Sequence, residues 1–243
     1  MRRYDIVLLD ADNTLFDFNA AEAQALEAVL AEFGWPCDAE SKRAYLEINH
    51  ALWTAFDRGE AEEGFLTVER FRRLGEHLGR SADPAEMNRR YLDHLGECGL
   101  LLPGAEDLCR TLREAGCRLA LATNGVARVQ YARLAGSPLA PYLERLFISG
   151  EMGTRKPEPA FFRAALSAMG AEDMSRCVMV GDGLGSDVKG ALSVGLDVIW
   201  FAPGGGTAPA DLTPTYTARS LAEIGRIICQ SPRSTERGDS GHV

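Results

Sequence analysis

Five short apolar runs are spaced along the chain, and each is bounded by polar or turn-forming residues. Runs of this kind, without alternating polar positions, are typical of strands buried on both faces of a sheet. Apolar residues at helical spacing follow the second, third and fourth runs, beginning near Val126, Glu158 and Ser186, and a last helix is predicted at 221–228. The predicted strands cover residues 6–9, 119–122, 146–148, 178–180 and 198–201.

This alternation of strands and helices predicts an α/β fold, in which helices cover both faces of a parallel sheet. In open parallel sheets, ligands bind at the carboxyl ends of the strands. Polar residues that follow the predicted strands are therefore expected to meet at one edge of the sheet, although they lie far apart in the sequence.

The segment between the first run and Pro103 has a different pattern, that of four amphipathic helices without a strand. Asp83 is the expected N-cap of the fourth helix, and Pro84 fits its first turn. An all-helical insert beside the ligand edge predicts a cap that excludes water and selects substrate; a purely stabilising subdomain is the alternative. We predict a core from residues 1–16 and 101–230, a cap from 17–100, and a polar, disordered tail at 231–243.

The composition is typical of a globular protein, and it limits the classes of partner that the protein can bind. The chain has 243 residues, of which 46% are hydrophobic, which is enough for a core and a small second domain. No apolar run is long enough for a signal sequence or a membrane span. Six cysteines without a C-x-x-C pair favour a reducing cytoplasm. A net charge of −9 disfavours a nucleic acid polymer or an anionic membrane as partner, and the oligomeric state is left open.

Two carboxylates follow the first predicted strand. Asp10 ends the buried run, where its charge requires a partner or a metal. Asp12, two residues later, can reach the same pocket, so one carboxylate can attack while the other handles a proton. A turn rich in Asp and Asn after a strand is also common without function.

The polar residues after the next two predicted strands are typical of a site that binds an anion. Thr123 ends a predicted strand, and Asn124-Gly125 leads into the following helix, so a hydroxyl and free backbone N–H groups meet there. Lys156 stands before Pro157, and an ammonium at this edge would neutralise a carboxylate and a phosphate together. Taken alone, either motif is also typical of an ordinary turn or of a solvated lysine.

The fourth motif is a glycine-rich turn with two acids, Asp182 and Asp187, after the run at 178–180. Asp182 can bind one hard cation while Asp187 orients a water or a backbone group. Mg²⁺ is expected, because it takes oxygen ligands and commonly only one or two carboxylates. The cation screens the repulsion between an aspartate and a phosphate dianion.

As a set, these motifs resemble the four motifs of the haloacid dehalogenase superfamily, in the same order and with a helical cap between the first two. The resemblance covers residues 4–228 and implies a Rossmann-like three-layer core with Mg²⁺-dependent hydrolysis of a small phosphomonoester through an aspartyl-phosphate. The motifs are Asp10-x-Asp12-x-Thr14, Thr123-Asn124, Lys156-Pro157 and Gly181-Asp182-x4-Asp187.

The resemblance also implies a role for each matching residue. Asp10 is the expected nucleophile, and Asp12 the general acid/base, whose backbone carbonyl also binds the metal. The expected site comprises Asp10, Asp12, Thr123 and Lys156 as catalytic groups, Thr123, Asn124 and Lys156 as substrate contacts, Asp10, Asp12 and Asp182 as metal ligands, and Thr14 and Asp187 as their supports.

Residues 10–17 and 123–125, together with Val129-Gln130 and Arg133-Leu134, are similar to the bacterial branch that hydrolyses pyrimidine nucleoside 5′-monophosphates. A nucleotide is therefore the expected substrate, although relatives often have Glu where this chain has Asn13. Aromatic residues of the insert can stack on a base, but their helical spacing favours core positions. These aromatic residues are Phe18, Tyr45, Trp53 and Phe56.

Other functions remain as alternatives. A phosphatase for a sugar phosphate or phosphoglycolate, or a β-phosphoglucomutase-like enzyme, would use the same residues. A dehalogenase needs no proton donor, so Asp12 argues against it. A non-enzymatic phosphoryl-accepting receiver domain is roughly half this length and lacks a cap. The four histidines have no metal-ligand spacing.

Overall fold

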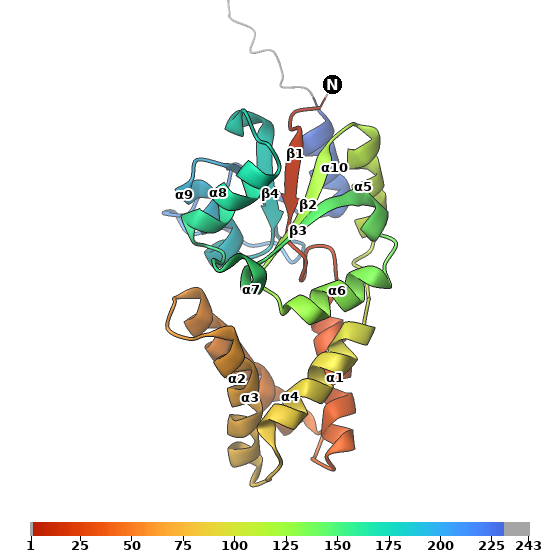
Figure 1. Ribbon diagram of the computed structural model, residues 1–243, viewed down its shortest axis with the longest axis vertical. Coiled ribbons are helices and arrows are strands. Elements are labelled where there is room, and N and C mark those ends of the chain that lie inside the picture. The colour runs from red at the N-terminus through yellow and green to blue at the C-terminus, as the bar shows by residue number, and fades with distance from the viewer. Residues whose placement is uncertain (1, 231–243) are drawn as a thin grey trace, which may run out of the picture.

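A six-stranded parallel sheet forms the centre of the computed structural model, which describes residues 2–230. The strand order is β3-β2-β1-β4-β5-β6, so the first strand lies in the middle (Figure 1). The predicted α/β fold with a parallel sheet is confirmed, whereas the predicted disordered tail lies outside the described residues. The strands are β1 (Ile6–Leu9), β2 (Arg118–Thr123), β3 (Leu143–Ile148), β4 (Cys177–Gly181), β5 (Asp197–Phe201) and β6 (Tyr216–Ala218).

Helices bury both faces of the sheet, because alternate residues of a strand point to opposite sides. Val7 and Leu9 of β1 pack in one apolar cluster, and Ile6 and Leu8 pack in the other. The first cluster is covered by α5 (Ala105–Glu114) and α10 (Leu221–Cys229), and the second by α8 (Pro159–Ala168) and α9 (Lys189–Ser193).

Short elements complete the edge of the sheet. The helix α6 (Ala127–Ala135) follows β2, and α7 (Ser149–Met152) follows β3. A single π-helical turn at Leu184–Val188 precedes α9, where the sequence predicts a helix starting near Ser186.

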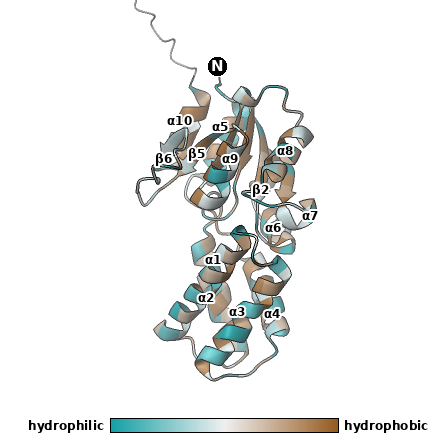
Figure 2. Ribbon diagram, turned by 90° about the vertical axis from the view of Figure 1, so that its left-hand side faces the viewer, coloured by the Kyte–Doolittle hydropathy of each residue, from teal (hydrophilic) through white to brown (hydrophobic). Residues whose placement is uncertain are grey.

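Four helices between β1 and α5 form a second body with its own apolar core, beyond the carboxyl edge of the sheet (Figure 1). Apolar residues of all four helices pack in one cluster, and Figure 2 shows hydrophilic residues along the same helices. Asp83 caps the fourth helix by accepting a hydrogen bond from the backbone N–H of Ala85, and Pro84 lies in its first turn. The helices are α1 (Phe18–Glu32), α2 (Ala39–Asp57), α3 (Glu63–Leu78) and α4 (Pro84–Glu97).

The strand β6 and the helix α5 are among the elements that the sequence does not predict. The strand β6 is absent from the prediction because these three residues contain one buried side chain, Ala218, and pair only at the edge with β5. The helix α5 is also unpredicted, although Leu108 and Leu112 pack its apolar side on the sheet. Every helix of the described chain is too short or too polar to cross a membrane.

A polar network crosses the core of the helical insert. Glu22 of α1 is 7% exposed and accepts a hydrogen bond of 2.7 Å from Asn49 of α2. Arg70 of α3 approaches the same asparagine, at 3.4 Å. Burial raises the pKa of Glu22 from 4.5 to about 7, against the opposing influence of Arg70. Its carboxylate form is therefore costly in the folded protein.

The substitution Glu22→Gln is expected to stabilise the protein at neutral and alkaline pH. Because folding raises the pKa of Glu22, the wild type loses stability as pH rises from about 4.5 to about 7, and glutamine removes this loss. The variant should gain about 3 kcal/mol at about pH 8, but under about 1 kcal/mol at about pH 5. Urea unfolding at both pH values measures the difference in the free energy of unfolding between variant and wild type. The substitution Glu97→Gln, at an exposed position, is the control. A difference that does not change with pH would contradict the assignment.

Candidate active site

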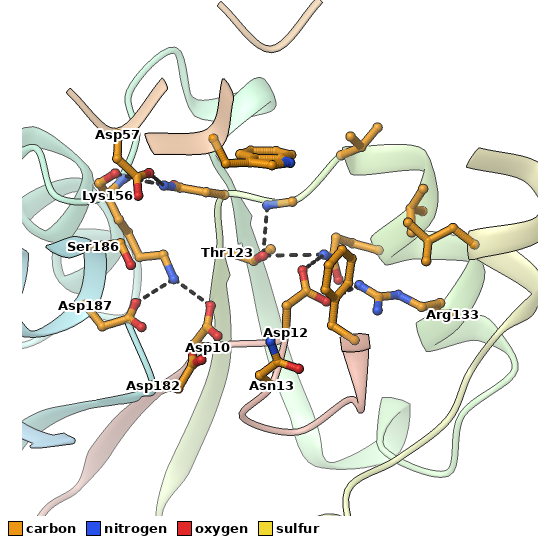
Figure 3. A pocket seen from close by; sticks show the side chains of 18 of the residues that line it. Asp10, Asp12, Asn13, Asp57, Thr123, Arg133, Lys156, Asp182, Ser186 and Asp187 are labelled. Carbon is orange, nitrogen blue, oxygen red and sulfur yellow. Dashed lines mark hydrogen bonds and ion pairs between the residues drawn. The ribbon is translucent and has the colours of Figure 1, made fainter. Parts of the chain in front are cut away.

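A cavity of about 360 Å³ lies where the carboxyl edge of the sheet meets the helical insert. Its floor is polar and comes from the ends of β1, β2 and β4 (Figure 3). Its upper walls are mainly apolar and come from the insert and the start of α6. The apolar wall residues are Phe18, Trp53, Leu92, Leu95, Val126 and Val129.

Asp10 lies at the end of β1 and is 6% exposed. One carboxylate oxygen accepts from Lys156 Nζ at 2.6 Å, and the other accepts from the hydroxyl of Thr14 at 3.2 Å. Burial raises the pKa of Asp10 well above its usual range, and Lys156 only partly offsets this effect. The carboxylate thus has fixed oxygens and an incompletely compensated charge.

Lys156 is buried and has an acceptor for each of its three N–H bonds. Its Nζ donates to Asp10 at 2.6 Å, to Asp187 at 2.7 Å and to the carbonyl of Ala122 at 2.8 Å. Burial acts to lower the pKa of this ammonium, but the two carboxylates outweigh burial and hold the pKa above its usual range. Figure 3 shows the ammonium between the two aspartates.

The side chain of Asn124 fixes the backbone of Lys156. Its Nδ2 donates to the Lys156 carbonyl at 2.8 Å, and its Oδ1 accepts from the Lys156 N–H at 2.9 Å. This side-chain amide is therefore bonded to the backbone of Lys156, and the substrate contact expected of Asn124 stays a prediction. The neighbouring Thr123 hydroxyl accepts from the Gly125 N–H at 3.0 Å, so its hydrogen can donate to a ligand.

Three carboxylates gather at one side of the floor. Oxygen atoms of Asp10, Asp182 and Asp187 lie within 4.8 Å of one another. Asp187 also accepts from the Gly183 N–H at 3.0 Å, and a Cβ at Gly181 would overlap its carboxylate, which explains the glycine-rich turn. Burial and the neighbouring Asp187 raise the pKa of Asp182 to about 7.

One ammonium does not balance these three carboxylates. A hard divalent cation prefers oxygen ligands, and here carboxylate oxygens come from neighbouring strand ends. The cation would also compensate the surplus of buried negative charge. The residues therefore fit Mg²⁺: Asp10 and Asp182 could hold the cation, and Asp187 is held in place by Lys156 and Gly183.

Asp12 lies at the opposite side of the floor, with a side chain that is 25% exposed. Its two carboxylate oxygens accept from different residues of α6. Arg133 Nη2 donates to Oδ1 at 2.5 Å, and Gln130 Nε2 donates to Oδ2 at 2.9 Å. A Cβ at Gly125 would overlap the Gln130 amide, so any other residue at this position would displace the Gln130 side chain.

The cavity brings together almost all residues predicted for the site. The exception is Thr14, which is fully buried behind Asp10 and touches it through the hydroxyl. The sequence prediction assigned no role to Arg70, Gln130, Arg133 or Ser186, which also line the cavity. The predicted residues that line the cavity are Asp10, Asp12, Thr123, Asn124, Lys156, Asp182 and Asp187.

Signals for three of these four missed residues exist in the sequence. Gln130 and Arg133 are three residues apart in a helix that starts directly after Thr123-Asn124-Gly125, so both face the same side. Arg70 stands in the apolar helical row of α3, where a charge is unexpected without a buried partner.

The aromatic residues of the insert divide into two groups. Tyr45 and Phe56 are buried in its core, as predicted. Phe18 and Trp53 are only partly buried and line the cavity, so the core prediction is incomplete for them. Helical spacing identifies the inward face of a helix, but it does not distinguish a packed core from a cavity wall.

Comparison with known proteins gives consistent matches. A family model described as haloacid dehalogenase-like hydrolase matches residues 4–195. The chain is 34% identical to the HAD-hydrolase YfnB of Bacillus subtilis over 94% of this chain and 97% of that protein. A crystal structure of YfnB bound to magnesium superposes with a TM-score of 0.87, over 93% of this chain and 99% of that one.

Two further relatives are described as pyrimidine 5′-nucleotidases. PynA of Streptococcus pneumoniae is 34% identical, over 91% of this chain and 93% of that protein. YjjG of Escherichia coli is 31% identical, over 94% of this chain and 99% of that protein. The similarity thus extends over the sheet and the helical insert alike.

Proposed function

Because the chain belongs to the haloacid dehalogenase-like hydrolases and is a phosphoric monoester hydrolase, we propose that its substrate is a pyrimidine nucleoside 5′-monophosphate. The observation that carries the proposal is the cavity itself. Its floor holds Asp10, Lys156 and Asp12 at one edge of the sheet, and its walls are apolar enough for a base.

In the proposed reaction, an oxygen of Asp10 attacks phosphorus, the new O–P bond forms, and the ester O–P bond breaks. Asp12 gives its proton to the leaving 5′ oxygen, which departs as the nucleoside alcohol. Asp12 then takes a proton from water, whose oxygen attacks the phosphorus of the aspartyl-phosphate. Phosphate leaves and Asp10 is regenerated, with Lys156 and the Thr123 hydroxyl holding the phosphoryl oxygens.

Mg²⁺ would be held by Asp10, Asp182 and the backbone carbonyl of Asp12, with Asp187 as their support. When bound, it supplies positive charge that screens the repulsion between a carboxylate and a phosphate and stabilises the charge of the transition state. The acidic cluster described above and the magnesium in the YfnB structure support this assignment.

Mg²⁺ is expected to raise the melting temperature of the wild type but not that of Asp182→Asn. The cation relieves the repulsion among buried carboxylates only in the folded protein, so it stabilises that state. At about a hundred times Kd the shift should be roughly 5–10 °C. Asp211→Asn, in an exposed loop, is the control and should keep the shift. An equal shift in Asp182→Asn would contradict the metal assignment.

The upper half of the cavity supports a nucleotide over a smaller phosphate ester. Phe18 and Trp53 offer aromatic surface to a planar base. Arg70 is 2% exposed and also lines the cavity; four of its five N–H groups donate within the insert, which leaves one N–H for a base carbonyl. A uracil or thymine ring combines these requirements, because it is planar and carries carbonyl acceptors.

Phosphate release from a panel of substrates tests this proposal. The panel contains pyrimidine and purine nucleoside 5′-monophosphates, sugar phosphates and 2-phosphoglycolate, each with Mg²⁺ and with EDTA. The proposal predicts the highest kcat/KM for UMP, dUMP or dTMP, and no release with EDTA. Preference for a sugar phosphate or phosphoglycolate would reject the nucleotide as substrate, and transfer of the phosphoryl group between sugar hydroxyls would identify a mutase.

A further inference from the structure

Gln130 and Arg133 contact Asp12 but have no role in the reaction as proposed above. They lie three residues apart on α6, so they project from one face of the helix. Each is 1% exposed, and each donates to a different oxygen of Asp12. The Asp12 carboxylate is therefore held at two points, as Figure 3 shows for Arg133.

The surroundings of Arg133 argue against a purely structural role. A buried arginine that stabilises a fold normally has several acceptors; Arg70, for example, donates to four oxygens within the insert. Arg133 donates only to Asp12, and its Nε and Nη1 have no hydrogen-bond partner among the described residues. The guanidinium otherwise lies over the ring of Phe16, at 4.9 Å from its centroid.

We infer that Gln130 and Arg133 form a clamp that positions Asp12 for proton transfer, an inference that rests on the proposed function of Asp12. An unrestrained aspartate samples several staggered rotamers, and only some of them direct an oxygen toward the leaving group. Two donors on two different oxygens fix the side chain and the plane of its carboxylate. Both residues are positioning residues, since they act through Asp12.

The clamp leaves Asp12 free to exchange a proton. A carboxylate has about four lone-pair sites, and the two donors of α6 occupy one on each oxygen. The remaining sites belong to a side chain that is 25% exposed and lines the cavity. Proton transfer to the ester oxygen, and later from water, can therefore use these sites while the clamp stays closed.

Gln130 also ties the clamp to the phosphoryl side of the cavity. Its Nε2 approaches the Thr123 hydroxyl at 3.4 Å as well as Asp12. Because α6 begins four residues after Thr123, the end of β2 and the clamp form one continuous segment. The spacing between a phosphoryl contact and the proton donor is thus set within this segment.

First-turnover kinetics with two leaving groups test the clamp. A p-nitrophenolate leaves without protonation, whereas the 5′ alkoxide of UMP requires a proton from Asp12. In Arg133→Met, first-turnover formation of uridine should fall about 10²-fold, because misplacing a catalytic group by about 1 Å costs this much. First-turnover release of p-nitrophenol should change less than about threefold and appear as a burst, because the later proton transfer from water is slowed.

Three further variants separate positioning from folding. Gln130→Met should give the same pattern to a smaller degree, and Arg133→Lys should recover part of the loss by keeping a charged donor. Arg128→Met removes another arginine of α6, one that bonds to Asp93 on α4 and does not contact Asp12. Its ratio of UMP to p-nitrophenyl phosphate rates should equal that of the wild type, with all melting temperatures recorded.

A double-mutant cycle completes the test. If the clamp acts through Asp12, adding Arg133→Met to Asp12→Asn should change the first-turnover rates by less than about twofold. Equal losses for both leaving groups in Arg133→Met, or losses that multiply in the double variant, would overturn the clamp. A wild type that hydrolyses neither ester would instead reject the proposed function, and the clamp with it.

Discussion

Asp10→Asn should lower turnover by at least about 10⁴-fold with every substrate, because the amide cannot act as the nucleophile. The same substitution should leave the melting temperature unchanged or higher. Burial raises the pKa of Asp10, so its carboxylate is costly in the folded state, and asparagine has the same shape without the charge. Loss of activity together with retained stability would show that Asp10 takes part in catalysis and is not needed for folding.

Asp5→Asn is a matched control for this prediction. Asp5 precedes β1 at the opposite end of the strand from Asp10 and bonds to Arg176 at 2.8 Å. The chemical change is the same, and its distance from the cavity predicts wild-type activity. Residual turnover of Asp10→Asn above a few per cent of wild type would contradict the covalent mechanism.

Lys156→Met should lower both stability and activity. The ammonium is the positive charge shared by Asp10 and Asp187, and all three side chains are buried. Removing one partner of a buried ion pair leaves uncompensated charge, at a cost of about 3–5 kcal/mol. Activity should fall about 10²–10³-fold with the loss of a preorganised donor to the phosphoryl group. Chemical denaturation and phosphate release measure the two effects.

The double variant Lys156→Met/Asp10→Asn tests the physical cause. The double variant also removes one of the two buried carboxylates that Lys156→Met leaves without a positive partner. It should therefore regain part of the stability lost in Lys156→Met. Lys189→Met, at the exposed start of α9, is the control and should stay within about 0.5 kcal/mol of wild type. Additive losses in the double variant would show that the ammonium does not act by compensating Asp10.

The sequence is sufficient to predict the floor of the site, for a physical reason. Asp10, Thr123 and Asp182 each end or follow a strand that is buried on both faces, and parallel strands place such ends at one edge. Local pattern and fold class together determine these positions. The strand β6 has no comparable pattern, since it is short and mainly exposed.

The contacts of side chains across elements are not predictable in this way. The pairing of Arg133 with Asp12 joins residues 121 positions apart and depends on how α6 packs beside the turn after β1. Likewise, the sequence places Asn124 near an anion, but only the structure shows that its amide is bonded to the backbone of Lys156. Arg70 and Trp53 reach the cavity through the packing of the insert, which helical periodicity does not specify.

Phosphorylation of Asp10 during turnover is the central claim, and mass spectrometry measures it directly. In Asp12→Asn, p-nitrophenyl phosphate should still phosphorylate the enzyme, because its leaving group needs no proton, whereas the later attack of water lacks its base. After acid quenching, the peptide that contains Asp10 should therefore gain the mass of one phosphoryl group, and the Asp10→Asn/Asp12→Asn variant should not. Release of p-nitrophenol and phosphate without any phosphorylated peptide would contradict the claim that Asp10 is phosphorylated during turnover.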